Sequence, residues 1–222
     1  MKKLFMIIVS LLLVLGGISV ASAEMIPGVY STGVDDDGNL LPFLEIDPHY
    51  VLSSALEVGA ETTNNHPAWA EETLTSQWIT PDGYGSTGTP LSAPPASPPA
   101  LAYTYTLTFD LTGFAASTAE IYGLWATDND SSIRLNSIDT GITKGITGFG
   151  SLADFAITSG FVDGINTLEF IVWNQPQATG NPTGLQVNII EATAAPVPEP
   201  ATMLLLGSGL VGLAGLRRRF KK

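Results

Sequence analysis

The feature that most limits how this chain folds is a strict alternation of apolar and polar residues near its middle. From Tyr103 to Leu111, every odd position is Tyr, Leu or Phe and every even position is Thr or Asp. Successive side chains of a β-strand point to opposite faces, so alternation with a period of two predicts a strand with one buried face. A helix would require apolar residues every three or four positions, and this segment has no such spacing.

Similar but shorter patterns recur along the chain. The clearest lie at 121–127, which is apolar on both faces, at 168–174, and at Leu185, Val187 and Ile189; weaker ones lie at 50–58 and 76–80. Turn-forming Gly, Asn and Asp gather between them, at 35–39, 128–131, 145–150, 163–166 and 174–184. Residues 151–157 are expected to form at most a short turn of helix. Many short strands separated by turns predict an all-β fold, an antiparallel β-sandwich or jelly roll.

Residues 24–194 are expected to form this β-sandwich as a single domain. Residues 85–100 contain five prolines in sixteen positions, which is typical of an extended loop. Strand patterns lie on both sides of this loop, and neither side is large enough to form a domain alone. The proline-rich segment is therefore predicted to be a long loop inside the domain.

Charge is distributed unevenly and excludes several classes of function. Residues 24–198 contain 20 of the 21 acidic residues but only Arg134 and Lys144 among the nine basic ones, which gives this part a formal charge of −18. Such a surface repels phosphate backbones, so nucleic acid is not expected as a partner. The chain has no cysteine, which excludes disulfides, thiolate zinc sites, iron–sulfur clusters and cysteine nucleophiles.

The N-terminus has the pattern of a secretory signal peptide. Lys2 and Lys3 precede an apolar run from Leu4 to Val20, and Ala21-Ser22-Ala23 follows as an A-x-A cleavage site. Residues 1–23 are predicted to form a signal helix that signal peptidase removes, with Ala21 and Ala23 at the cleavage site and Glu24 as the first mature residue. The alternative is a retained N-terminal anchor.

The C-terminus, residues 195–222, has three parts in a fixed order. Pro198-Glu199-Pro200 comes first, then residues 201–216 without a charge, and then a basic tail at 217–222. The prolines keep their segment extended. Sixteen apolar or small residues make a transmembrane helix of about 24 Å, short for a hydrocarbon core of about 30 Å. The basic tail is expected to remain cytoplasmic.

This order resembles the PEP-CTERM sorting signal of Gram-negative bacteria that make exopolysaccharide. The resemblance implies recognition by an exosortase, a membrane-embedded protease, with cleavage near Pro198, Glu199 and Pro200. It also implies that the membrane holds the precursor only transiently, before the protein reaches the cell surface or extracellular matrix. The alternative is a permanent membrane anchor with a proline-rich stalk.

A second resemblance covers residues 103–190. The segments Thr-Phe-Asp-Leu, Trp125-Ala-Thr-Asp-Asn129, 161–166 and Asn181-Pro-Thr-Gly184 are similar to galactose-binding-like jelly-roll domains of bacterial surface proteins. This resemblance implies a β-sandwich that carries a structural calcium ion and binds sugars through loops at one end. It transfers no ligand-binding residue to a position of this sequence.

Two groups of oxygen-bearing residues are candidates for a structural Ca²⁺. Asp35, Asp37 and Asn39 have the alternate spacing that calcium loops use, although the other features of an EF-hand are missing. Asp128 and Asp130, at the end of a predicted strand, form the second candidate. The alternative in both cases is a set of solvated turn residues.

Aromatic residues supply the candidates for sugar binding. Trp69, Trp78 and Tyr84 lie in or near predicted loops, where a flat ring stacks on a sugar face if it is exposed. Core packing is the alternative for Trp69 and Trp78, and it is the expected role of Trp125 and Trp173, which lie in strand patterns.

The sequence contains no catalytic signature. Neither the G-x-S-x-G nor the H-E-x-x-H motif occurs, and the two histidines are isolated. We therefore expect a non-enzymatic, exosortase-sorted surface or matrix protein associated with exopolysaccharide. The alternatives are a calcium-dependent carbohydrate-binding module and a glycan-active enzyme.

Overall fold

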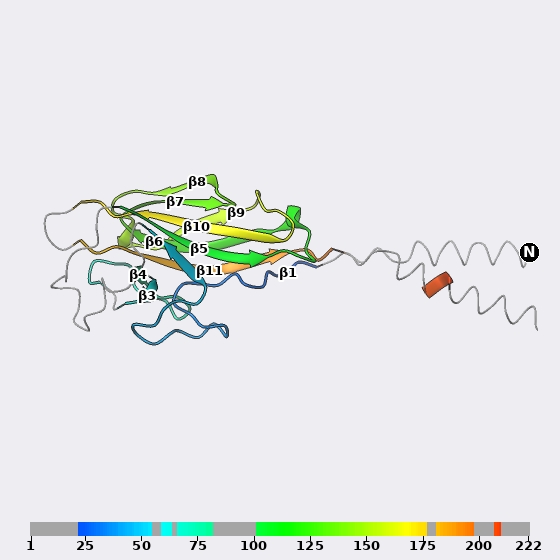
Figure 1. The fold of residues 1–222 in the computed structure, drawn as a ribbon, viewed down its shortest axis with the longest axis horizontal. Helices are drawn as coiled ribbons and strands as arrows, with labels where there is room; N and C mark the ends of the chain where they lie inside the picture. Colours follow the sequence, from blue (N-terminus) through cyan, green and yellow to red (C-terminus); the bar gives the residue numbers. More distant parts are fainter. Residues whose placement is uncertain are drawn as a thin grey trace, which may run out of the picture. The chain divides into compact units, whose positions relative to one another are not determined.

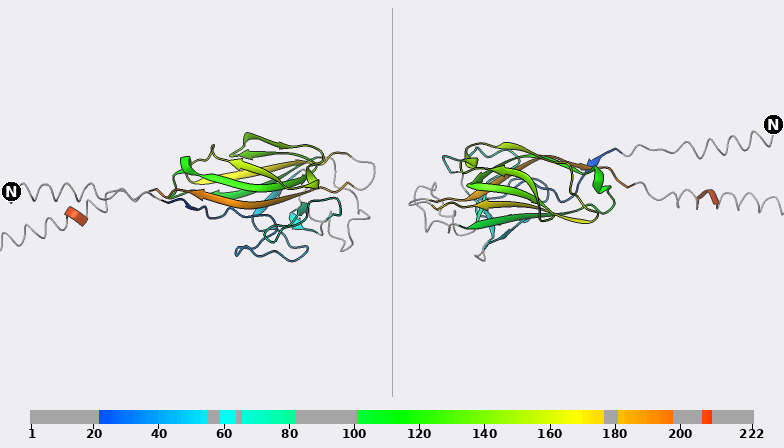
Figure 2. Two further views of the ribbon diagram at one scale, coloured as in Figure 1. Left: turned by 180° about the vertical axis from the view of Figure 1, so that it is seen from behind. Right: turned by 90° about the horizontal axis from the view of Figure 1, so that it is seen from above.

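The strands form two antiparallel sheets that stack face to face (Figures 1 and 2). The structure, a computed structural model, describes residues 22–54, 59–63, 66–81, 101–176, 181–197 and 207–209. Glu24–Ala195 form one compact unit that contains all the strands named below. The all-β prediction is confirmed.

One sheet has six strands and the other has five. The six-stranded sheet has the spatial order β3 (Ala60–Thr62), β4 (Ile79–Pro81), β11 (Gly184–Ala194), β6 (Glu120–Asp128) and β9 (Ala153–Ile157), and β1 (Glu24–Met25) also pairs with β11. The five-stranded sheet has the order β2 (Tyr50–Ser53), β5 (Ala102–Asp110), β10 (Ile165–Trp173), β7 (Asp130–Leu135) and β8 (Ile138–Lys144). Two 3-10 turns are η1 (Ala116–Thr118) and η2 (Gly148–Gly150).

The strand pairs are nested. Strand β7 pairs with β8, β6 with β9, β5 with β10, and β4 with β11, all antiparallel. The chain therefore folds back on itself at the β7–β8 hairpin, and the resulting ribbon wraps so that its successive pairs alternate between the two sheets. This eight-strand arrangement is a jelly roll, so the finer fold prediction also matches the strand order.

Alternate residues of the strands fill the space between the sheets. On β5, Tyr103, Tyr105, Leu107 and Phe109 are buried. The matching positions of β10 and β11 are also buried: Leu168, Phe170, Val172, Leu185 and Val187. Each strand contributes every second side chain, because the pleat turns the others to the opposite face.

The outer face of the six-stranded sheet has a cover of its own. The segment 66–78 lies over β6 and β11, and Trp69, Trp78 and Ala70 form a second apolar cluster with Ala126 of β6. This cover accounts for apolar Ala126 on the outer face of β6, whereas Tyr122 and Leu124 on the same face are only half-buried.

Two regions differ from the sequence prediction. Residues 153–157, expected to form at most a turn of helix, are strand β9. The segment after 128, predicted as a turn, continues into β7, and Asn136 and Ser137 form the β7–β8 turn with φ of 53° and 64°. Positive φ at both central residues is the geometry of a type I′ hairpin. Asn-Ser is a weaker signal for that turn than Asn-Gly, so the hairpin was missed.

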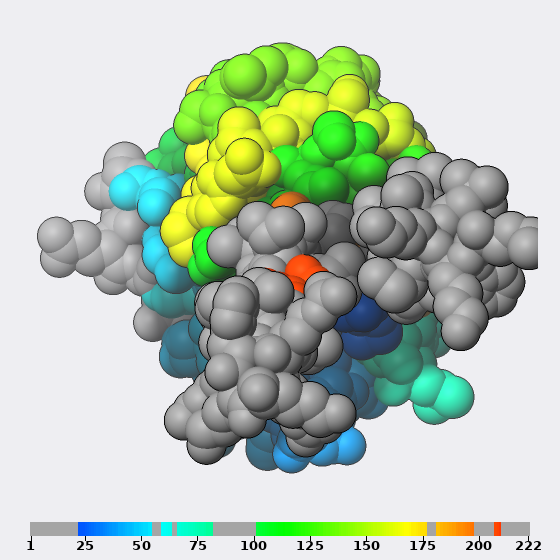
Figure 3. Space-filling view, turned by 90° about the vertical axis from the view of Figure 1, so that its right-hand side faces the viewer, coloured from blue at the N-terminus to red at the C-terminus, as the bar shows by residue number. Residues whose placement is uncertain are grey.

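The two ends of the compact unit lie side by side. In the β1–β11 pair, Glu24 is opposite Ala194 and Met25 is opposite Thr193. The backbone of Ala195 is held by Thr118 Oγ1, at 2.8 Å, and by Ala115 N, also at 2.8 Å. Figure 3 looks onto this end of the sandwich, where the dark blue of the N-terminal residues and the orange of the last part of β11 are both visible. Strands β3 and β4 lie toward the other end (Figure 1).

Most of both terminal predictions lies outside the described residues. This holds for residues 1–21 of the signal peptide and for nearly all of the helix predicted at 201–216. Within the part of the chain that is described, no helix is long and apolar enough to cross a membrane. The proline-rich loop at 85–100 also lies outside the described residues.

Glycine at position 123 permits a close approach inside the fold. A Cβ atom there would lie 2.6 Å from Phe155 Cε1 and 2.8 Å from the Asn188 carbonyl oxygen. We expect Gly123→Ala to lower the free energy of unfolding by about 1–3 kcal/mol, because buried Phe155 and the β11 backbone would have to move. Urea-induced unfolding of the full-length chain measures this change.

Gly145→Ala is the matched control, since a Cβ atom there meets nothing within 4 Å. Its free energy of unfolding should change by less than about 0.5 kcal/mol. Equal effects of the two substitutions would contradict the close-packing argument.

Candidate functional site

An exposed tryptophan lies at one end of the five-stranded sheet. Trp173, the last residue of β10, is 44% exposed, although its neighbour Val172 is completely buried. In the sheet register, Trp173 lies opposite Ala102 of β5 on one side and opposite Asp130 of β7 on the other. The Cβ atoms of directly opposite residues are about 4.5–5.5 Å apart. The ring therefore has a small side chain on one flank and a carboxylate on the other.

Gln175 completes this surface. Its side-chain Nε2 donates a hydrogen bond of 2.5 Å to Asp130 Oδ2, and its backbone N–H donates to Asn129 Oδ1 at 2.9 Å. The carboxylate and the carboxamide therefore lie in fixed positions beside the ring. We call Trp173, Ala102, Asp130 and Gln175 the Trp173 surface.

A buried polar layer supports this end of the sandwich. Asn129, which holds Gln175, is only 1% exposed. Thr183 Oγ1 donates to the backbone oxygen of Asp128, and Thr127 Oγ1 donates to the backbone oxygen of Asn129 at 2.9 Å. The Thr127 hydroxyl also bonds Ser131 Oγ of β7 at 2.7 Å. These bonds join β6, β7 and the residue before β11, so the Trp173 surface is built on rigid elements.

The structure buries two of the three aromatic residues predicted to bind sugar. Trp69 is 5% exposed and Trp78 is 0% exposed, and the two rings stack at 4.2 Å between centroids. Both indole N–H groups have internal partners: Trp69 Nε1 donates to Asp128 Oδ2 at 2.8 Å, and Trp78 Nε1 donates to the Ala70 carbonyl oxygen at 3.0 Å. Burial contradicts the sugar-binding role for these two residues and agrees with core packing, the alternative expected from the sequence. Tyr84 lies outside the described residues.

Trp173 is the residue that sequence reasoning assigned wrongly, as a core residue. The signal that identifies it was present in the alternation. Leu168, Phe170 and Val172 share the buried face of β10, so Trp173 has the opposite parity and must share the outer face with Glu169. Trp125, the other tryptophan predicted to be in the core, is 1% exposed and confirms that prediction.

Asp128 and Asp130, the second calcium candidate, have separate partners. Both carboxylate oxygens of Asp128 accept hydrogen bonds, one from Trp69 and one from Asn129 Nδ2, and the residue is 4% exposed. Asp130 instead bonds Gln175 at the Trp173 surface. Burial raises the pKa of the Asp128 carboxyl to about 6, and the hydrogen bond from Trp69 partly opposes this shift.

The first calcium candidate is the tip of a short hairpin. Asp35 Oδ1 accepts the backbone N–H groups of Asp37, at 2.9 Å, and Asn39, at 2.8 Å, and the Asn39 side-chain amide also faces this carboxylate. These hydrogen bonds hold the pKa of the Asp35 carboxyl below its usual value. Hydrogen bonds alone thus account for the shape of the turn. Among the described residues, no group of three or more His, Cys, Asp or Glu side chains is placed to hold a metal ion.

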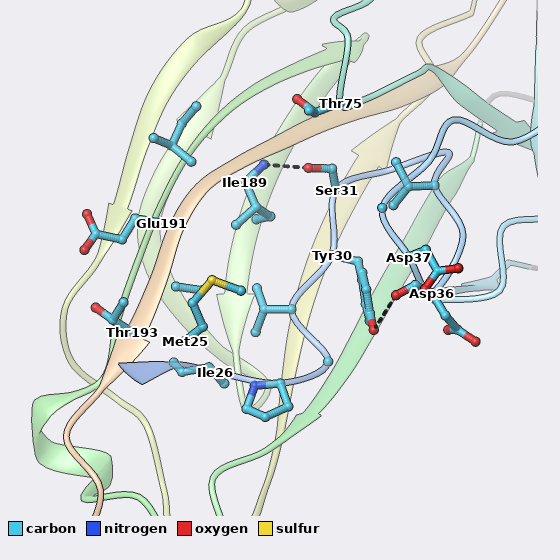
Figure 4. A pocket seen from close by; sticks show the side chains of 17 residues that line it. Met25, Ile26, Tyr30, Ser31, Asp36, Asp37, Thr75, Ile189, Glu191 and Thr193 are labelled. Carbon is cyan, nitrogen blue, oxygen red and sulfur yellow. Dashed lines mark hydrogen bonds between the residues drawn. The ribbon is translucent and has the colours of Figure 1, made fainter. Parts of the chain in front are cut away.

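A groove of about 490 Å³ lies between β11 and the segment that follows β1 (Figure 4). Its walls are mainly apolar, and Asp36, Asp37 and Glu191 lie at its rim. Ser31 Oγ accepts the Ile189 N–H at 3.0 Å, and the Tyr30 hydroxyl donates to the Asp36 carbonyl oxygen at 3.4 Å, so part of its polar lining is engaged internally.

The processing residues are only partly described. Ala23 is exposed, and Glu24 begins β1. Ala21, Pro198, Glu199 and Pro200 lie outside the described residues, so the geometry at both cleavage sites stays a prediction.

Comparison with known proteins identifies the C-terminal segment. Residues 196–219 match the PEP-CTERM protein-sorting motif. No curated protein matches the chain. The match confirms the sorting-signal resemblance for the tail.

Solved structures with a similar fold include carbohydrate-binding modules at very low identity. A CBM35 from Paenibacillus barcinonensis has 10% identity and a TM-score of 0.33, with 68% of this chain and 94% of that chain covered. A CBM4 module has 10% identity and a TM-score of 0.36, with 77% and 97% covered. A CBM35 solved with a disaccharide that contains glucuronic acid has 15% identity and a TM-score of 0.26, with 66% and 99% covered. At TM-scores this low, the structural likeness supports no conclusion, and the description of the fold rests on the strand order alone.

The raised pKa of Asp128 predicts a pH dependence of stability. A carboxyl whose folded-state pKa lies above its unfolded value of 3.8 favours folding at low pH, and this contribution falls as pH rises through about 6. Asp128→Asn removes this titration and keeps an acceptor for the Trp69 N–H, but its amide nitrogen would face Asn129 Nδ2 and lose that hydrogen bond. We therefore expect the free energy of unfolding of the variant, relative to the unsubstituted chain, to rise by about 1–3 kcal/mol between pH 4 and pH 7.5.

Urea unfolding of the full-length chain at both pH values checks this expectation. Asp154→Asn, at an exposed position of β9, is the control, because it makes the same change of charge away from the Trp69 contact. A difference in the free energy of unfolding between Asp128→Asn and the unsubstituted chain that does not change with pH would contradict the raised pKa of Asp128.

The calcium hypothesis makes a separate prediction. A Ca²⁺ ion bound at Asp35, Asp37 and Asn39 raises the melting temperature in millimolar CaCl₂ relative to EGTA, because a ligand of the folded state stabilises it. Asp37→Asn should reduce that increase. Melting curves that coincide in CaCl₂ and EGTA would contradict the calcium hypothesis.

Proposed function

We propose that this chain is an exported, non-catalytic surface protein whose β-sandwich binds polysaccharide through the Trp173 surface. The premise is the PEP-CTERM protein-sorting motif at residues 196–219, which implies export and sorting by an exosortase. The Trp173 surface supports the other part of the proposal, polysaccharide binding by the β-sandwich.

The observation that carries this proposal is an exposed indole beside a fixed carboxylate–carboxamide pair. The apolar face of a sugar ring stacks on an aromatic ring, while its hydroxyls need hydrogen-bond donors and acceptors at the edge. Trp173 supplies the ring, Asp130 supplies acceptors, and Gln175 supplies both donors and an acceptor. Ala102, opposite Trp173 on β5, contributes only a methyl group to the surface.

The position of this surface suits a protein that is held by its C-terminus. Gly184 of β11 lies opposite Asp128, close to the Trp173 surface, whereas Ala194 lies opposite Glu24. Eleven strand residues separate the two ends of β11 by about 35 Å. The binding surface and Ala194, the last residue of β11, are thus at opposite ends of the sandwich.

Processing at both ends belongs to the same proposal. Signal peptidase would cut after Ala23, so that the mature chain starts in β1, and the exosortase would cut near Pro198–Pro200. The ligand would be the exopolysaccharide of the matrix into which the protein is released. Calcium would have only a structural role in this scheme.

Affinity electrophoresis of the full-length chain in gels that contain polysaccharides tests the binding role. We expect at least one neutral or cationic polysaccharide to retard the protein, and Trp173→Ala to weaken binding at least tenfold. The matched control is Ile165→Ala, since Ile165 is 61% exposed on the outer face of the same strand, about 25 Å away. It should bind as the unsubstituted chain does.

Two outcomes would count against the proposal. Absence of retardation by every polysaccharide would leave a purely structural matrix role. Release of reducing ends from a polysaccharide would instead favour the glycan-active enzyme.

A further inference from the structure

The charges around Trp173 indicate what kind of glycan this surface prefers. Among the described residues, Gln175 is the hydrogen-bond partner of the Asp130 side chain. A carboxamide is neutral, so the negative charge of Asp130 remains uncompensated next to an exposed ring.

The two basic residues of the domain do not neutralise Asp130. Lys144 Nζ donates to the carbonyl oxygens of Gly148, at 3.3 Å, and Ser151, at 3.1 Å, and it lies 5.8 Å from the centroid of the Trp125 ring. Arg134 lies opposite Glu169, four residues from Asp130 along β7, which is about 13 Å. Glu169, the other carboxylate on this face of the sheet, therefore has Arg134 beside it, whereas Asp130 lies opposite the neutral Trp173.

The domain as a whole adds a field of the same sign. Residues 24–198 have a formal charge of −18, which attracts cations and repels uronate, sulfate or phosphate groups on a polymer. Screening limits this long-range field to about 8 Å at physiological salt, so the local carboxylate determines the position of the bound charge.

An aromatic face with a carboxylate at its edge is suited to an ammonium group. The ring quadrupole attracts a cation over its face, and the carboxylate attracts it at the edge. We infer that the glycan recognised at the Trp173 surface carries free amines, as in a polymer of deacetylated amino sugars. This inference rests on the proposed polysaccharide-binding role and specifies its ligand class.

Two oligosaccharides with the same backbone test the inference. Deacetylated and fully N-acetylated chitohexaose differ only in the amine, and titration calorimetry with the full-length chain at pH 5.5 and low salt compares them. We expect the amine form to bind at least tenfold more tightly, and its affinity to fall as NaCl is added.

Three variants separate the local charge from the general field. Asp130→Asn keeps an acceptor for Gln175 but removes the charge, and it should lose most of the tenfold preference while N-acetylated binding persists. Glu169→Gln makes the same change of charge on the same sheet face and should alter the preference less than threefold. Trp173→Ala should weaken the binding of both oligosaccharides.

Each contrary result has a distinct meaning. Equal or tighter binding of the N-acetylated form overturns the amine inference and leaves the polysaccharide-binding role intact. Equal effects of Asp130→Asn and Glu169→Gln also overturn it, because the general field would then be the cause. Failure of both oligosaccharides, together with no retardation by any polysaccharide, overturns the proposed function itself.

Discussion

The arrangement of this domain depends on β11, a central strand whose first five residues, 184–188, are buried on both faces. Its inner face contributes Leu185 and Val187 to the core between the sheets. Its outer face presents Gln186 and Asn188, which are 0% and 7% exposed. Polar side chains at such depth need partners, because an unsatisfied buried polar group costs about 1–3 kcal/mol.

The segment that precedes β4 supplies a partner for Gln186 Nε2 and one for Asn188 Oδ1, whereas Gln186 Oε1 has no hydrogen-bond partner among the described residues. Gln186 Nε2 donates to Ser76 Oγ at 3.1 Å, and Thr75 Oγ1 donates to Asn188 Oδ1 at 2.9 Å. The same segment places Trp69 and Trp78 against Ala126, and the Trp69 indole reaches Asp128 at the end of β6. The cover therefore buries Trp69 and Trp78, the two tryptophans that were candidates for sugar binding, and it connects through Asp128 to the polar layer below Trp173.

That connection gives the two ends of the sandwich different roles. At one end, β1 pairs with the last residues of β11, and η1 holds Ala195, so the chain leaves the domain from a fixed position. At the other end, Asn129 and Gln175 hold the groups around the exposed ring of Trp173. The separation of Ala194 from the aromatic surface follows from the length and direction of a single strand, β11.

The sequence by itself determined the fold class, the main strands and the sorting motif. The alternation of apolar and polar residues in β5 and β10 indicates which side chains face the core. The sorting motif at residues 196–219 consists of consecutive residues, so it is recognised without knowledge of the fold. Strands β7, β8 and β9 were not predicted. Their apolar residues are few, the Asn136-Ser137 turn between β7 and β8 is a weak hairpin signal, and β9 pairs with β6, about 30 residues earlier in the chain.

The tertiary structure alone determined which tryptophans are exposed and which partners the carboxylates have. Parity places Trp173 on an outer face, but exposure depends on whether another segment covers that face, and only the six-stranded sheet has such a cover in the described chain. The environment of Asp128 and Asp130 likewise comes from contacts with Trp69 and Gln175, which lie 59 and 45 residues away, and no local spacing encodes contacts at that range.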